Sequence, residues 1–95
     1  MAPQFEWDPD KNRSNLRKHG VSFEEAVTVF RDENAELLKD SDNSSEEDRF
    51  TLLGLSFKHR ILIVCHCYRK SDTVIRLISA RKASPFERRK YEDSL

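Results

Sequence analysis

Arg60-Ile-Leu-Ile-Val-Cys-His-Cys-Tyr-Arg-Lys-Ser-Asp-Thr-Val-Ile-Arg-Leu-Ile-Ser-Ala80 is the stretch of sequence that decides the fold. It holds two apolar runs, residues 60–68 and 73–80, and both are rich in the Val, Ile and Leu that favour strands. Only the short polar turn 70–72 separates them, and a connection of this length can join only antiparallel neighbours. The stretch therefore predicts two adjacent antiparallel strands.

The same pattern extends toward the N-terminus. Residues 50–57 form another apolar run, and the turn Lys58-His59 joins it to the run at 60–68, which predicts a three-stranded meander. A shorter apolar piece at 35–38 adds a fourth strand, and residues 4–7 are a candidate edge strand. We expect an antiparallel sheet of about four strands, with this possible addition at its edge.

Helix signals stand on both sides of the predicted sheet. Asp8-Pro9 matches a helix N-cap followed by proline at the first helical position, and Gly20 matches a helix stop, so a helix is predicted over residues 9–19. Ser22-Phe-Glu-Glu25 reads as a capping box that opens a second helix, and Ser84-Pro-Phe-Glu87 as one that opens a third, which runs to about Tyr91. The fold class predicted is α+β.

The length and composition indicate one domain over residues 1–95. A chain of 95 residues with 37% hydrophobic residues can bury one modest core but not two. We expect a cytoplasmic protein with free thiols, because the longest apolar run is strand-sized and Cys65 and Cys67 are badly spaced for a disulfide. We expect no contact with a membrane.

The zero net charge hides a strong asymmetry between the two halves. Residues 1–48 hold six Lys/Arg and thirteen Asp/Glu, with an acidic run at 40–48 that predicts a solvated loop, whereas residues 49–95 hold eleven and four. The second half thus has the charge of an anion-binding surface. The alternative is that the two halves simply attract each other across the fold.

The candidate chemistry centres on His66. Strand alternation places His66 and Tyr68 on one face, and Arg76 interrupts the apolar run of the next strand. A meander can gather the arginines of its strands on one sheet face around His66; these are Arg49, Arg60, Arg69, Arg76 and Arg81, followed by Lys82. RNA cleavage without a metal needs such a set, in which arginines hold the phosphate while a base and an acid move protons.

We accordingly predict catalytic roles for four residues and substrate contacts for four more. The catalytic set is Arg49, His66, Arg76 and Arg81, and the substrate-binding set is Arg60, Tyr68, Arg69 and Lys82. The plain alternatives are a structural histidine and arginines paired with carboxylates. We predict neither a metal nor another cofactor, because His66 faces away from both cysteines in a strand and no second cluster with zinc spacing exists.

The chain resembles the BrnT family of toxins along nearly its whole length. The segments that carry the resemblance are Phe5-Glu-Trp-Asp8, Asn15, Lys18-His-Gly-Val-Ser-Phe-Glu-Glu-Ala26, Glu47-Asp-Arg49, His66 with Arg69, Ile75-Arg-Leu-Ile-Ser-Ala-Arg-Lys-Ala83, Glu87 and Tyr91. Between His66 and Arg69 the chain departs from the family, because Cys67 and Tyr68 stand where relatives often have Thr and Glu. This departure removes a candidate base, although Tyr68 can instead stack on a nucleobase.

The resemblance implies a fold like that of the RelE-type toxins and a ribonuclease activity that inhibits translation. It also implies a cognate antitoxin of the ribbon-helix-helix class in a complex of two toxins and two antitoxins, through which alone the toxin would contact DNA. A non-catalytic module that binds RNA or an acidic protein is the alternative, and it predicts salt-sensitive binding without strand scission.

Overall fold

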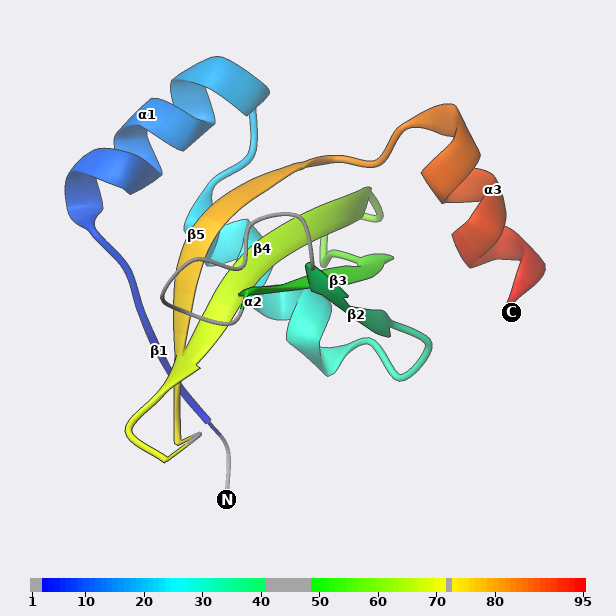
Figure 1. Ribbon diagram of the computed structural model, residues 1–95. Helices are drawn as coiled ribbons and strands as arrows, with labels where there is room; N and C mark the ends of the chain where they lie inside the picture. Colours follow the sequence, from blue (N-terminus) through cyan, green and yellow to red (C-terminus); the bar gives the residue numbers. More distant parts are fainter. Residues whose placement is uncertain (1–2, 41–48, 72) are drawn as a thin grey trace.

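A single mixed sheet organises the chain in the computed structural model, which describes residues 3–40, 49–71 and 73–95 (Figure 1). The described elements in chain order are β1 (Gln4–Glu6), α1 (Pro9–His19), α2 (Phe23–Thr28), the 3₁₀ turn η1 (Val29–Arg31), β2 (Glu36–Asp40), β3 (Arg49–Leu55), β4 (Ile61–Arg69), β5 (Val74–Lys82) and α3 (Pro85–Asp93). The predicted α+β class is confirmed. None of the helices in this described part is long and apolar enough to cross a membrane.

The five strands lie in the order β1-β5-β4-β3-β2. β3, β4 and β5 form the antiparallel meander that the short turns predicted, and β2 pairs antiparallel with β3. The predicted N-terminal edge strand is present, but it runs parallel to β5, with Phe5 opposite Ile75. The acidic run was predicted to be a loop; its residues 41–48 lie outside the described part of the chain.

The helix ends follow the sequence signals. The Asp8 side chain accepts a hydrogen bond from the Asp10 backbone N–H at 2.9 Å, and Gly20 ends α1 with a φ of 72°, which glycine adopts without steric cost. The capping box at Ser84 is complete. The predicted box at Ser22 is only half formed, because the Glu25 side chain accepts hydrogen bonds from Ser56 and Arg60 instead.

One face of the sheet is covered by α2 and η1, which lie behind it in Figure 1. Phe23, Ala26 and Val29 from these elements are fully buried against strand residues such as Leu62 and Val64. We call this the inner face, and the opposite surface of the sheet the outer face. α3 contacts β3. Its residue Tyr91 is buried, and the Tyr91 hydroxyl donates to Asp32 at 2.6 Å.

An irregularity in the β4–β5 pairing changes which β5 residues point outward. Cys65 lies opposite Ser79, whereas the next residue, His66, lies opposite Leu77, so β5 has one residue more than β4 over this step. Strict alternation would place Arg76 and Arg81 on opposite faces of the sheet, because they are an odd number of residues apart along β5. The extra residue restores both arginines to the outer face, with Arg76 opposite Cys67 and Arg81 opposite Ile63.

Candidate functional site

His66 lies on the inner face and is fully buried. Its ring contacts those of Phe30, Tyr68 and Phe50, with centroid distances of 4.9, 5.3 and 6.2 Å. Nδ1 lies 3.1 Å from the carbonyl oxygen of Val64, and Nε2 has no hydrogen-bond partner within the described residues. Burial lowers the pKa of His66, and the hydrogen bond to Val64 only partly offsets this effect.

The prediction that the arginines surround His66 on an open face is therefore wrong. Alternation correctly placed His66 and Tyr68 on one side of β4, but that is the side that the helices cover. Tyr68 is half-buried there, in edge contact with Phe50 at 5.2 Å between centroids. Both residues are thus separated by the thickness of the sheet from the arginines of the outer face, Arg76 and Arg81.

On the outer face, four residues form a row across four strands. Glu6 of β1 lies opposite Arg76 of β5, and Arg76 lies opposite Cys67 of β4. Phe50 pairs with His66, so the residue before it, Arg49, lies level with Cys67 on β3. Strands are about 4.8 Å apart, which puts the backbones of Arg49 and Arg76 about 10 Å apart, within reach of one bound phosphate.

Glu6 is held between two guanidinium groups. Arg76 Nη1 donates to Glu6 Oε2 at 2.9 Å, and Arg69 Nε lies 3.6 Å from the same oxygen. The side chains of Glu6 and Arg76 are each 35% exposed, so solvent reaches this arrangement. We call Glu6, Arg49, Arg69 and Arg76 the Glu6–arginine cluster.

Arg81 belongs to a second, separate centre on the same face. It donates two hydrogen bonds to the Glu87 carboxylate, at 2.8 and 3.0 Å. Arg81, together with the cap at Ser84, lowers the pKa of Glu87 to about 2. Arg76 and Arg81 lie about 16 Å apart at the rise of an extended strand, so Arg81 is not part of the Glu6–arginine cluster.

Arg60 is fixed by a buried carboxylate instead of facing the cluster. Its Nε donates to Glu25 Oε2 at 2.9 Å, its Nη2 bonds both Glu25 Oε1 and the Gly20 carbonyl, and the Ser56 hydroxyl donates to the same carboxylate at 2.7 Å. Burial opposes ionisation of Glu25, but the hydrogen bonds from Arg60 and Ser56 outweigh it and lower its pKa. Lys82 is exposed at the end of β5, near Arg60 and far from Arg76.

The structure thus brings together Arg49, Arg69 and Arg76 from the predicted set, and leaves His66, Tyr68, Arg60, Arg81 and Lys82 elsewhere. The alternative that the two halves of the chain attract each other also has support. Ion pairs that join the halves are Glu6 with Arg76 and Arg69, Glu25 with Arg60, and Glu36 with Lys90. In the Glu6–arginine cluster, however, the carboxylate is outnumbered by guanidinium groups.

Glu6 is the residue that sequence reasoning missed. A single carboxylate before Trp7 gives no signal of its own, because its partners are some seventy positions away and depend on the parallel pairing of β1. Glu87 was recognised only as a helix cap, and its contact with Arg81 was likewise not foreseen. Among residues 3–40, 49–71 and 73–95, no three His, Cys, Asp or Glu side chains gather as a metal site.

Comparisons with known proteins agree on one family. A family profile described as "Ribonuclease toxin, BrnT, of type II toxin-antitoxin system" matches residues 7–87. The crystal structure of the Brucella abortus ribonuclease toxin BrnT is similar in fold, with a TM-score of 0.66 and 21% identity over 87% of this chain and 99% of that one. No curated protein matches the sequence significantly. The predicted likeness to RelE-type toxins stays a prediction.

Proposed function

Since the chain belongs to the family of BrnT ribonuclease toxins of type II toxin–antitoxin systems, we propose that it cleaves RNA without a metal at the Glu6–arginine cluster. The observation that carries the proposal is the partly exposed carboxylate of Glu6 between the guanidinium groups of Arg76 and Arg69. This arrangement supplies a proton acceptor beside fixed positive charge, which is what phosphodiester cleavage by the neighbouring 2′-hydroxyl requires.

In the proposed reaction, Arg49 and Arg76 bind the non-bridging oxygens of one phosphate. Glu6 accepts the proton of the 2′-hydroxyl through Oε1 as the 2′-oxygen forms a bond to phosphorus. The bond from phosphorus to the 5′-oxygen breaks, and the 5′-oxygen takes a proton from solvent. The products are a 2′,3′-cyclic phosphate and a 5′-hydroxyl, and both arginines neutralise the charge that develops on the phosphorane.

Glu6 suits the role of proton acceptor better than the other candidates. His66 was our expected proton-transfer residue, but its enclosure by three aromatic rings keeps it from a bound phosphate unless β4 and the helices separate. Glu87, with a pKa of about 2, is a weak base and is already engaged by Arg81 and the backbone N–H of Ser84. Arg81 then serves as a contact to a more distant part of the RNA.

The test is cleavage of a fluorescent single-stranded RNA by purified protein in EDTA, with the product ends identified by mass spectrometry. We expect Arg76→Ala and Glu6→Gln each to lower kcat by about 10²-fold, because each removes a group that acts on the transition state. Arg89→Ala is the matched control, since Arg89 is exposed on α3 and forms no ion pair within the described residues. Its kcat should stay within about twofold of wild type.

Two outcomes would contradict the proposal. Full activity of the Glu6→Gln, Arg76→Ala double variant would exclude the cluster as the catalytic site. Salt-sensitive RNA binding by wild-type protein without any scission would favour the non-catalytic binding module. Thermal unfolding of each variant separates loss of chemistry from loss of fold, and we expect small shifts because these ion pairs are solvent-exposed.

Membership of a type II family implies a protein antitoxin as partner. We further propose that this antitoxin is a ribbon-helix-helix protein, and that two toxins and two antitoxins assemble in the cytoplasm. In this complex the toxin contacts DNA only through the antitoxin. Coexpression with the product of the neighbouring gene, followed by light scattering of the purified complex, tests the stoichiometry. A complex of any other composition would overturn this part of the proposal.

A further inference from the structure

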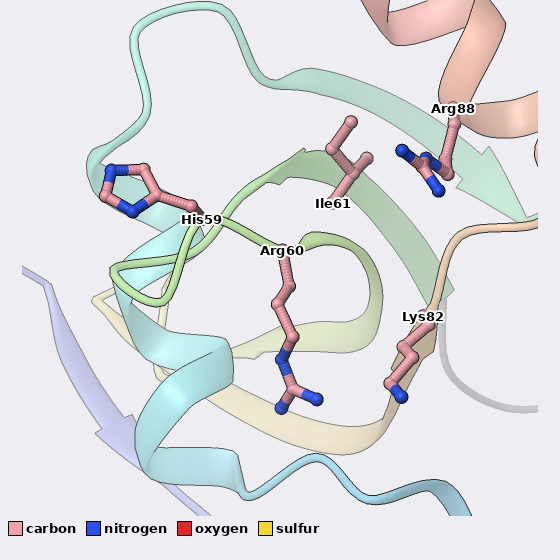
Figure 2. Close-up of a pocket in the computed structure, with 5 residues that line it drawn as sticks. All are labelled: His59, Arg60, Ile61, Lys82 and Arg88. Atoms are coloured by element: carbon pink, nitrogen blue, oxygen red, sulfur yellow. The ribbon is translucent and has the colours of Figure 1, made fainter.

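A pocket of about 250 Å³ opens at the end of the sheet opposite the Glu6–arginine cluster, and its lining is mostly cationic. Figure 2 shows the residues that line it: His59, Arg60, Ile61, Lys82 and Arg88. They come from the turn before β4, the start of β4, the end of β5 and α3. We call this the basic pocket.

The cations of the basic pocket are positioned by the fold. The Arg60 guanidinium is held by the buried Glu25 carboxylate and by the Gly20 carbonyl. The backbone beside Lys82 is fixed because the next residue, Ala83, donates to the Ile61 carbonyl at 2.9 Å. Arg88 lies in the first turns of α3, which the complete capping box at Ser84 anchors. The pocket is therefore largely formed before any ligand arrives.

Among the residues that the structure describes, the basic pocket carries more positive than negative charge. Glu25 balances Arg60, but Lys82 and Arg88 form no ion pair with any residue of the described ranges. None of the described residues that line the pocket is a carboxylate. His59 adds little, because its ring points away from Lys82 and Arg88 in Figure 2. An anion entering here would meet two cations that have no ion-pair partner in the described part of the chain, and the edge of a fixed guanidinium.

The size and composition of the basic pocket indicate which anion fits. A volume of about 250 Å³ lies below the range typical of sites for whole drug-sized ligands, but it accommodates a phosphate group. Ile61 is the single apolar residue in the lining, whereas a protein-docking site has an apolar centre with aromatic anchors. A phosphate of a nucleic-acid backbone is the better match.

We propose that the basic pocket, through Lys82 and Arg88, binds a backbone phosphate of the RNA substrate outside the scissile bond. Arg76 and Lys82 stand near opposite ends of β5, about 20 Å apart at the rise of a strand. Arg81 lies on the outer face at the Lys82 end of β5, so it is the outer-face arginine nearest to the pocket along this strand. This inference rests on the proposed function, because it assigns the substrate of that same site a second point of attachment.

The direct test measures binding of a fluorescent octanucleotide with 2′-O-methyl riboses, which cannot be cleaved, across a series of salt concentrations. The Lys82→Gln, Arg88→Gln double variant should bind about tenfold more weakly. The slope of log Kd against log salt should fall by about 0.7, which is the value for one phosphate contact on a single strand. Arg89→Gln removes one positive charge from α3 outside the pocket, and should change Kd by less than twofold.

A second measurement uses cleavable RNA of two lengths. A dinucleotide cannot span from the Glu6–arginine cluster to the basic pocket, so wild type and the double variant should cleave it equally. For an octanucleotide, the double variant should show a KM raised about tenfold with kcat unchanged, because a contact outside the scissile bond contributes uniform binding.

The outcomes distinguish this inference from the proposed function. Loss of kcat on both lengths, or an equal loss in Arg89→Gln, would overturn the basic pocket as a phosphate site. Normal RNA binding combined with lost antitoxin binding in the double variant would also overturn it, in favour of a protein-docking surface. If wild type binds the methylated octanucleotide through the pocket but cleaves nothing, the proposed function fails while the pocket assignment stands.

Discussion

The side chain of Asn15 forms two hydrogen bonds with the backbone of Ala80, in the place where a neighbouring β-strand would form them. Its Nδ2 donates to the Ala80 carbonyl at 2.8 Å, and its Oδ1 accepts from the Ala80 N–H at 3.1 Å. β1 pairs only with the start of β5, so the remaining edge of β5 lacks a neighbouring strand. Asn15 on α1 covers that edge, and the same Nδ2 also donates to the Val21 carbonyl at 2.8 Å.

Asn15→Ala should lower the free energy of unfolding by about 2–4 kcal/mol, because it leaves several buried backbone groups without partners. Asn15→Asp should be at least as damaging, since a carboxylate cannot donate to the Ala80 and Val21 carbonyls. Urea unfolding followed by circular dichroism measures both. Ser14→Ala, on the exposed side of α1, is the control and should cost under about 0.5 kcal/mol. Equal losses at the two positions would contradict the edge-covering role.

His66 should make stability depend on pH in a defined window. Because its folded-state pKa is lowered, the unfolded chain binds the proton more readily than the native one. The contribution of His66 is fully present above a pH of about 6.5 and is lost as the pH falls below that value. Glu25, whose pKa is lowered from 4.5, adds its own loss only at more acidic pH. Urea midpoints between pH 5 and 7 therefore report on His66.

His66→Phe should remove this pH dependence and keep or raise stability at pH 5.5, because phenylalanine needs no partner for a ring nitrogen and suits three aromatic neighbours. His59→Asn, at an exposed turn position, should leave the dependence as in wild type. The same variant tests the catalytic prediction for His66. If folded His66→Phe keeps its ribonuclease activity, His66 has no role in proton transfer. A loss of kcat at unchanged stability would instead support the catalytic prediction for His66.

Gly54→Ala should destabilise the fold by about 1–3 kcal/mol through overpacking. A Cβ at position 54 would lie 2.9 Å from both Ala35 Cβ and Val29 Cγ1, and Ala35 has no flexible side chain that could move away. Differential scanning calorimetry should show a lower Tm. Adding Val29→Ala removes one of the two clashes but leaves that with Ala35, so the two changes should not be additive. Simple additivity would show that steric conflict is not the cause.

Tyr91→Phe should loosen α3 from the sheet. The Tyr91 hydroxyl donates to Asp32 Oδ2 at 2.6 Å, and Asp32 also accepts from the backbone N–H groups of Leu55 and Asn34. Burial and the neighbouring Asp32 carboxylate raise the pKa of Tyr91 to about 12. Loss of this donor should cost about 1–3 kcal/mol in urea unfolding. Faster hydrogen exchange should be confined to α3 and the segment around Asp32, and a uniform increase would contradict the local role.

Much of this fold is predictable because its signals are local. Asp8 and Gly20 mark the two ends of α1. The meander follows from turns that are too short to join anything but antiparallel neighbours. The parallel pairing of β1 is not predictable in this way, because a strand of three residues has no period to read and its partner is far along the chain.

The candidate site was only partly predictable for a related reason. Alternation tells which side chains share a face, as with His66 and Tyr68, but not which face the helices cover. It also fails at the step between Cys65 and His66, where β5 gains a residue and Arg81 changes sides. Glu6 meets Arg76, and Arg88 meets Lys82, only through tertiary packing. No spacing in the sequence therefore identifies Glu6 or Arg88 as a candidate site residue.

The parallel pairing of Glu6 with Arg76 has a consequence for the order of events during synthesis. These two residues belong to the first and the last of the described strands, so the carboxylate and Arg76 meet only after the chain has been synthesised through β5. A nascent or truncated chain that stops before β5 has α1 and α2 but lacks Arg76 and therefore the complete Glu6–arginine cluster. The proposed catalytic cluster is thus completed late in synthesis, and a chain that lacks β5 should not cleave RNA.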